Sequence, residues 1–268
     1  MEILHFSAGT LAGYGVSGVC MILLAVGAVL IWQKRTHAPI PPMVAGAVVF
    51  PVFALGLKLL PAYFLLYHDN PVAKAVTGST LLTALVAGGL AGVFEETGRF
   101  IAFSLLKKKF PARETAISYG IGHGGFEAVY IGVTMISLIA MGIMVNTGHI
   151  DELTKDLPPA QIPVAMEQIK SYASQSFGMS MLGIVERIFA LCLHVGLSVM
   201  VFRAAYDKPC FWLYPVAVVL HTAVDFCAVM FKSHVLLVEA GFALCSVLLL
   251  LLAIRFLYRT YEPKEAIA

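Results

Sequence analysis

Long runs of apolar residues recur along this chain, each close to the length that crosses the hydrocarbon core of a membrane. About 20 residues of α-helix span ~30 Å of hydrocarbon. Seven stretches meet that length: Leu11 to Trp32, Pro42 to Tyr67, Thr80 to Leu106, Ala116 to Val145, Phe177 to Phe202, Phe211 to Phe231 and Val235 to Tyr258. The pattern predicts an all-α integral membrane protein, in which residues 1–268 form a single bundle of about seven transmembrane helices.

The loops between these stretches predict the orientation of the chain. Short cytoplasmic loops collect Lys and Arg, and here such residues follow the first span, at Lys34 and Arg35, and the third, at Lys107 to Lys109. This distribution predicts an N-terminus outside and a C-terminus in the cytoplasm. The longest loop, about residues 146–176, then lies outside, and its part from Ile162 to Tyr172 is either a short surface helix or a solvated lid.

Composition agrees with a membrane protein and removes one class of partner. Hydrophobic residues make up 59% of the chain and the mean hydropathy is +0.86, far from the balance of a soluble domain. The net charge is only +2, and no basic stripe with interleaved aromatic residues is present. Nucleic acid is therefore excluded as a partner, and the lipid bilayer is expected in its place.

Four of the apolar spans carry ionisable groups near their centres. They are Glu95, Glu96 and Arg99; His123 and Glu127; Glu186, Arg187 and His194; and His221 and Asp225. Such groups cost several kcal/mol each in hydrocarbon, so they persist where they pair, bind an ion or react. In the predicted topology, the two glutamates of the third span and the three histidines lie roughly 12 to 16 Å from the cytoplasmic ends of their helices, at 1.5 Å per residue. This agreement predicts one site in the cytoplasmic half of the membrane.

The spacing within each span suggests how these groups act. Residues four apart share a helix face, so His123 is expected to point with Glu127, and His221 with Asp225. A carboxylate one turn from an imidazole can hold its tautomer, raise its basicity or add a metal ligand. Arg99 can neutralise one of the paired glutamates and leave the other to act on water. Three histidines at one depth suit a catalytic zinc ion with an open fourth position.

Taken in order, these motifs resemble those of the YhfC-type membrane peptidases. The pattern runs from Glu95-Glu96-x-x-Arg99 through His123-Gly-Gly-x-Glu127 and a histidine in the fifth span to His221-x-x-x-Asp225. It is also similar to the PrsW proteases and, more distantly, to the CAAX prenyl endopeptidase superfamily. The resemblance covers roughly Leu81 to Val229, which is the expected catalytic core.

The resemblance implies an intramembrane endopeptidase of a bacterial plasma membrane, acting on a membrane-embedded or membrane-associated peptide or protein. Glu95 or Glu96 would be the general base on a water molecule, with the catalytic set completed by Arg99, Glu127 and Asp225. The water would be held by zinc bound through His123, His194 and His221, or by the imidazoles without a metal. His221 with Asp225 could instead donate to the oxyanion of the tetrahedral intermediate.

Two other classes of function fit the same residues. A proton- or ion-coupled transporter also places Glu, His and Asp in mid-membrane, but the sequence has no inverted repeat. A catalytically silent scaffold would use these groups as a buried network that binds partner helices, although the intact Glu95-Glu96 pair and the three histidines argue against it. A further cation, Lys58 in the second span, either reaches toward the membrane surface or binds an anionic group.

Overall fold

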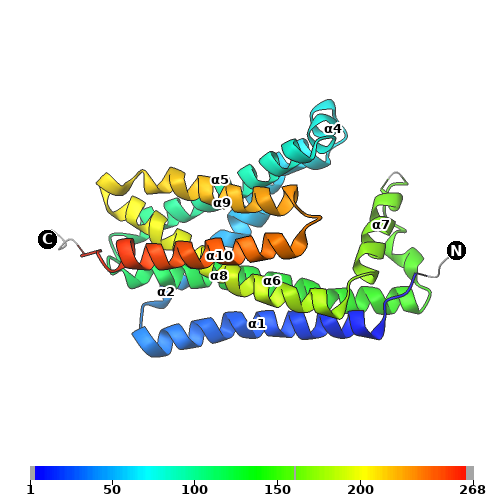
Figure 1. Cartoon of the computed structure of the whole chain (residues 1–268), viewed down its shortest axis with the longest axis horizontal. Helices are drawn as coiled ribbons and strands as arrows, with labels where there is room; N and C mark the ends of the chain where they lie inside the picture. The colour runs from blue at the N-terminus through cyan, green and yellow to red at the C-terminus, as the bar shows by residue number, and fades with distance from the viewer. Residues whose placement is uncertain (1–3, 160, 264–268) are drawn as a thin grey trace. The chain divides into compact units, whose positions relative to one another are not determined.

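The computed structural model describes residues 4–159 and 161–263 and is built from helices (Figure 1). Within this part of the chain no β-strand occurs, and seven helical segments are long and apolar enough to cross a membrane. These segments are α1 (Ala8–Thr36), α2 to η2 (Ile40–Tyr67), α5 (Thr80–Leu106), α6 (Glu114–Asn146), α8 (Phe177–Tyr206), η4 with α9 (Lys208–Met230) and α10 with η5 (Val235–Tyr258). The predicted all-α membrane fold is confirmed, and each predicted span coincides with one of these segments.

The second span is not one regular α-helix. It consists of α2 (Ile40–Val49), the π-helical η1 (Phe50–Leu57), α3 (Leu59–Ala62) and the π-helical η2 (Tyr63–Tyr67). Pro51 lacks a backbone N–H and so interrupts the regular α-helical ladder. Seven residues later, the amide of Lys58 donates to the carbonyl of Phe53, five residues back, at 3.0 Å. Because π-turns shift the helical register, simple helical spacing does not give the direction of the Lys58 side chain.

Three shorter helices lie outside the spans: α4 (Pro71–Thr77), η3 (Ile150–Leu153) and α7 (Ile162–Ala173). The chain begins α4 with an Asn70 side chain that accepts from the amide of Ala73 at 2.9 Å, a common N-cap arrangement. In the long loop, the alternative of a surface helix is the one found, since α7 covers the stretch concerned.

The described residues form two compact units. One comprises residues 4–26 with 128–159 and 161–188, and the other comprises residues 27–127 with 189–263. Three long helices, α1, α6 and α8, each contribute residues to both units.

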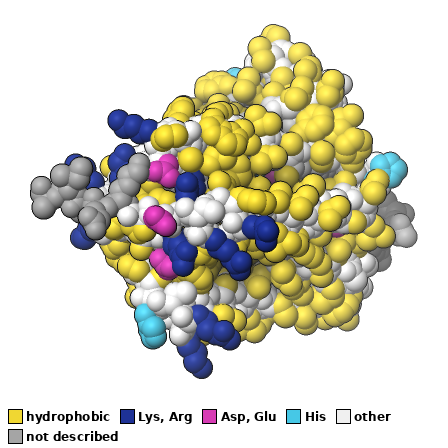
Figure 2. Space-filling model, turned by 60° about the vertical axis from the view of Figure 1, so that its left-hand side comes forward, with side chains coloured by type: hydrophobic (Ala, Val, Ile, Leu, Met, Phe, Trp, Pro, Cys, Tyr) yellow, Lys and Arg dark blue, Asp and Glu magenta, His cyan; other side chains and the backbone are white. Residues whose placement is uncertain are grey.

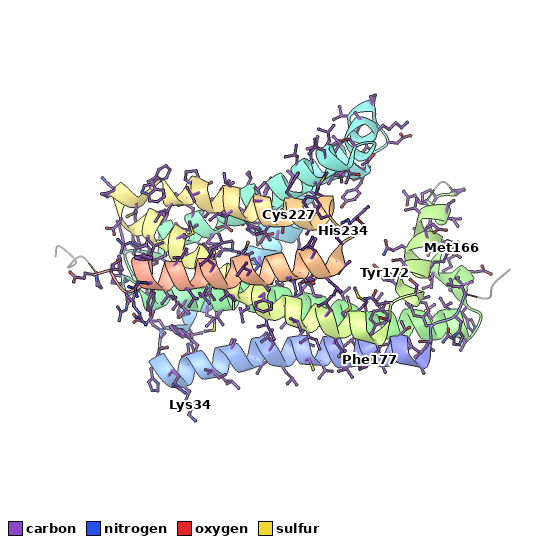
Figure 3. All side chains as sticks on the ribbon, in the orientation of Figure 1. Lys34, Met166, Tyr172, Phe177, Cys227 and His234 are labelled. Carbon is purple, nitrogen blue, oxygen red and sulfur yellow. The ribbon has the colours of Figure 1, made fainter. Side chains whose placement is uncertain are left out.

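The smaller unit has its own apolar core and two polar ties. Its buried core residues are Phe6, Tyr14, Leu138, Val145 and Ile169. Met166 and Tyr172 of α7 pack against this core (Figure 3). The Tyr14 hydroxyl donates to the carbonyl of Tyr172 at 2.8 Å, and the Asn146 side chain bonds both the amide and the carbonyl of Phe6 at 2.8 Å. These bonds hold α7 and the start of the chain to this unit.

In the larger unit, α5 and α9 (Leu213–Met230) lie side by side (Figure 1). Glycines permit their close approach. A Cβ added to Gly88 would lie 2.7 Å from the carbonyl oxygen of Thr222, and one added to Gly92 would lie 2.7 Å from that of Val218. Small residues at such contacts let helix backbones meet closely within a membrane. This contact brings the centre of α5 to the centre of α9.

Large apolar side chains are exposed on the surface, and several ionisable side chains are buried. Large apolar side chains are widely exposed, as with Leu105 at 78% and Leu236 at 74%, and hydrophobic side chains cover most of the face shown in Figure 2. A bilayer would cover apolar surface of this extent. By contrast, Glu96, Arg99 and His123 are 0% exposed, so these ionisable groups lie inside the larger unit.

Candidate functional site

Arg99 and Glu96 of α5 form an ion pair that is fully enclosed by protein. Arg99 Nε lies 3.1 Å from Glu96 Oε2, and both side chains are 0% exposed. Arg99 Nη1 also donates to the carbonyl of His194 at 2.7 Å and to Ser198 Oγ at 2.5 Å. The guanidinium is therefore committed to groups within the protein, and we refer to Glu96 and Arg99 as the sealed pair.

His221 of α9 approaches the sealed pair from the other side. Its Nδ1 lies 2.7 Å from Glu96 Oε1, so Glu96 is held at one oxygen by Arg99 and at the other by His221. The remaining nitrogen, Nε2, is 3.9 Å from Glu95 Oε2 and 3.9 Å from Asp225 Oδ2. His221 is thus fixed by Glu96 and presents Nε2 to the other two carboxylates.

Glu95 makes a separate set of contacts. Its Oε2 lies 3.2 Å from His123 Nε2 of α6, and its Oε1 lies 3.7 Å from Lys58 Nζ of the second span. His123 is wholly buried, and its Nδ1 has no hydrogen-bond partner among the described residues. The ring packs edge-on against Phe50, with centroids 5.2 Å apart. Packing therefore positions the His123 ring and leaves Nε2 directed at Glu95.

His194 of α8 has a partner at each ring nitrogen. Arg99 Nη2 lies 3.3 Å from Nδ1, and because a guanidinium can only donate, Nδ1 must be the acceptor. Nε2 therefore donates to Glu127 Oε2, at 2.7 Å. Ser198, one turn further along α8, contacts both the His194 carbonyl and Arg99. Sequence reasoning did not select Ser198, although its spacing of four residues from His194 is a usable signal.

Glycines on α6 bring these helices within reach of one another. A Cβ added to Gly120 would lie 2.7 Å from Val195 Cα of α8, and one added to Gly122 would collide with the Met43 carbonyl of α2. His123 is therefore carried on a backbone packed directly against two neighbouring helices. The glycine density around His123 in the sequence reflects this packing.

Three of these groups lie close enough together to share a metal ion. Glu95, His123 and His194 each offer a ligand atom within 4.8 Å of the others, and all three side chains are buried. His221, which the sequence analysis placed among the metal ligands, lies outside this group; its Nδ1 contacts Glu96, and its Nε2 is 3.9 Å from Glu95 Oε2. Two imidazoles with one carboxylate are a common donor set of catalytic zinc sites.

The remaining charged groups lie on a less buried side of the cluster. Side-chain exposure is 28% for Lys58, 19% for Glu127 and 38% for Asp225. Asp225 interacts electrostatically with both Glu127 and Lys58, as well as with Glu95. We call Lys58, Glu127 and Asp225 the rim residues, since their side chains are more exposed than those of the histidines.

The neighbouring charges on α8, Glu186 and Arg187, belong to the smaller unit. They form an ion pair with each other.

Comparison with known proteins identifies the family. The model of the YhfC intramembrane metalloprotease family matches residues 20–260. The chain belongs to this family. It is also 31% identical over 225 residues to the uncharacterized membrane protein YhfC of Bacillus subtilis (strain 168), covering 82% of this chain and 84% of that protein. No solved structure matches the chain.

Membership confirms the resemblance to the YhfC-type proteins, and the seven apolar segments agree with a location in a membrane. The bacterial relative and the seven apolar segments identify an integral protein of the bacterial plasma membrane. The name of the YhfC family also implies a metal, which the cluster of Glu95, His123 and His194 is suited to bind.

Proposed function

We propose that this protein is an intramembrane metallopeptidase, which hydrolyses peptide bonds with water activated at a divalent metal ion held by Glu95, His123 and His194. The observation that carries the proposal is the approach of these three donors, from α5, α6 and α8, to within 4.8 Å of one another. The family to which the chain belongs is described as an intramembrane metalloprotease family.

The donor types of the cluster fit a divalent cation. The carboxyl groups of Glu95, Glu96, Glu127 and Asp225 lie among the imidazoles of the three histidines. Carboxylates and imidazoles are ligands that zinc and similar divalent ions accept. When bound, such an ion lowers the pKa of a coordinated water and polarises a carbonyl group.

The two histidines each offer one suitable nitrogen. In His194, Nε2 carries the proton that it shares with Glu127. To bind a metal, Nε2 would have to release this proton, and Nδ1 would then carry the ring N–H and give up its contact with the Arg99 guanidinium. In His123, Nε2 already faces Glu95, while the buried Nδ1 lacks a hydrogen-bond partner. The proposed ligand atoms are therefore both Nε2 atoms and a carboxylate oxygen of Glu95.

Glu127 is the carboxylate best suited to accept a proton from the water. It contacts His194 Nε2 at 2.7 Å and is 19% exposed, so it is more accessible than Glu96. Glu96 is less suited because both of its oxygens are engaged and its side chain is 0% exposed. Glu95 is then a metal ligand, and Glu96 orients His221. A positioned general base typically contributes about 10²- to 10⁴-fold to the rate.

His221 would serve the oxyanion of the tetrahedral intermediate. Its Nδ1 donates to Glu96, which fixes the ring and leaves Nε2 facing Glu95 and Asp225. A protonated Nε2 can donate to an oxyanion formed beside Glu95, and Asp225 would stabilise that protonated state. In this role His221 acts on the substrate without binding the metal.

Metal content tests the ligand assignment. Wild-type protein purified without chelator is expected to hold about one divalent ion per chain, because a catalytic site of this donor set binds one ion. Glu95→Gln, His123→Ala and His194→Ala should each lose it, whereas His221→Ala should keep it. His68→Ala is the matched control, since this exposed histidine bonds Tyr63 far from the cluster. Retention of the ion in His123→Ala or His194→Ala would contradict the assignment.

Cleavage of a quenched fluorescent library of transmembrane peptides in proteoliposomes tests the reaction. Glu127→Gln should keep the metal and lose activity by about 10²-fold or more. Glu167→Gln is the control, because Glu167 is an exposed carboxylate paired with Lys170 on α7. Full activity in Glu127→Gln would exclude Glu127 as the base. A transporter would instead show ion flux dependent on Glu95 without cleavage, and a scaffold would show neither.

A further inference from the structure

The two adjacent glutamates of α5 are each paired with a cation, but the two cations differ in exposure, in distance from the glutamate and in their other contacts. Arg99 is 0% exposed and lies 3.1 Å from Glu96, with further contacts to His194 and Ser198. Lys58 is 28% exposed and lies 3.7 Å from Glu95. Among the described residues, Lys58 Nζ has no other ion-pair partner and no hydrogen bond. The pair on Glu96 is fixed, and the pair on Glu95 is loose.

The local backbone directs Lys58 to this position. Lys58 lies between η1 and α3, where its amide bonds five residues back to Phe53 at 3.0 Å. The same segment packs tightly on α5, since a Cβ added to Gly98 would lie 2.6 Å from Phe53 Cγ. Irregular turns of this kind are frequent at functional sites. The π-helical turn and the close contact with α5 therefore bring the ammonium to Glu95.

Lys58 and a bound metal would require the same carboxylate. Glu95 directs Oε2 to His123 and His221 and Oε1 to Lys58. A metal bound by Glu95 and His123 would place two positive charges beside the ammonium, and like charges repel at short range. A lysine can respond by moving, because its charge sits on a flexible four-carbon stem and Lys58 is on the rim.

We propose that Lys58 is a positioning residue that acts as the counter-ion of Glu95 in the metal-free protein and competes with the metal for that carboxylate. The proposal rests on the metal centre proposed above. In the metal-free state Lys58 neutralises a buried carboxylate and so stabilises the fold. In the metal-bound state the same ammonium opposes binding and lowers metal affinity. Loss of the ammonium should thus have opposite effects on the stability of the metal-free protein and on its affinity for metal.

A zinc titration of chelator-stripped protein, with a fluorescent chelator as competitor, tests the effect on affinity. Lys58→Met should bind zinc roughly ten-fold more tightly than the wild type, because a repelling charge is removed. Lys58→Arg keeps the charge and should stay within about two-fold of the wild type. Lys74→Met is the matched control, as Lys74 pairs with Asp69 at 2.7 Å on an exposed loop.

Thermal unfolding gives the second readout. In excess chelator, Lys58→Met should unfold at a lower temperature than the wild type, and the difference should shrink or reverse at saturating zinc. If Lys58→Met does not fold, Lys58→Gln removes the same charge while keeping a polar end.

Each further outcome has a defined consequence. Equal or weaker zinc binding by Lys58→Met, with wild-type binding intact, would overturn the role of Lys58 and leave the metal centre standing. Failure of the wild type itself to bind zinc or another divalent ion would overturn the metal centre and the role of Lys58 together. Unchanged stability of Lys58→Met in chelator would remove Lys58 as the counter-ion of Glu95.

Discussion

Removal of Arg99 is the sharpest test of the buried network. Arg99→Met replaces the guanidinium with an apolar side chain and leaves Glu96 in place. Glu96 is 0% exposed, so neither water nor lipid headgroups can compensate its charge. The substitution also removes the donors to the His194 carbonyl and to Ser198. One mutation therefore leaves the buried Glu96 carboxylate without its cation and removes two hydrogen bonds to α8, the helix that carries His194.

The expected loss follows from the degree of burial. Removing one partner of a buried ion pair costs about 3–5 kcal/mol, because the remaining charge is left uncompensated. The full value applies here, since both side chains are inaccessible. In a chain of this size, 1 kcal/mol shifts the unfolding midpoint by roughly 2–4 °C. Arg99→Met is therefore expected to lower the midpoint by about 10 °C.

Thermal unfolding in detergent, at one fixed heating rate, measures this shift. The double variant Glu96→Gln with Arg99→Met has no stranded charge, so it should recover a large part of the loss, and the pair should be coupled by about 0.5–3 kcal/mol. Arg99→Lys keeps a positive charge but not the planar set of donors, so it should fall between the wild type and Arg99→Met. If the double variant is as unstable as Arg99→Met, the loss arises from packing and the electrostatic argument is wrong.

Three further predictions concern packing, topology and the smaller unit. Gly92→Ala should destabilise the protein by about 1–3 kcal/mol, because its Cβ would meet the Val218 carbonyl of α9. Gly89→Ala on the same helix meets no atom within 4 Å, so it should be neutral or slightly stabilising. Thermal unfolding measures both effects. A fluorescent protein fused to the C-terminus should fluoresce in the cytoplasm, and alkaline phosphatase inserted at Lys155 should be active outside, in line with the loop charges. Asn146→Ala should cost about 1–3 kcal/mol through loss of both bonds to Phe6, without loss of bound metal.

The spans were predictable because hydropathy and length depend on the membrane alone. Each predicted stretch coincides with a helical segment, within a few residues at its ends, because about 20 apolar residues have few alternatives to a helix in hydrocarbon. The convergence of Glu95, His123 and His221 was also foreseeable, since buried ionisable groups at one depth must find one another.

The pairing within the site was not predictable from spacing. His123 and Glu127 share a helix, but His123 contacts Glu95 and Glu127 contacts His194. The helical rule gives residues on one face, and it does not say which neighbouring helix lies opposite. His221 and Asp225 show the same limit, because Glu96 at 2.7 Å takes precedence over Asp225 at 3.9 Å.

Lys58 shows a second limit of sequence reasoning. An assumed α-helix through Pro42 to Tyr67 gives Lys58 a direction, but the π-helical turns of η1 change the register. Pro51 was visible in the sequence, yet a proline predicts a disturbance of a helix and not its form. The contact with Glu95 at 3.7 Å could therefore be found only from the folded chain.

The structure gives a physical reason for two adjacent glutamates. Neighbours on a helix point about 100° apart, so Glu96 turns to Arg99 and His221 while Glu95 turns to His123 and Lys58. A single carboxylate could not be held between Arg99 and His221 and also remain available to a metal ion. The sealed pair of Glu96 and Arg99 holds His221 in place, and the pair of Glu95 and Lys58 can separate when a metal ion binds Glu95. Because the positive charge beside Glu95 is what opposes the metal, Lys58→Arg should leave zinc affinity within about two-fold of the wild type, whereas Lys58→Met should raise it.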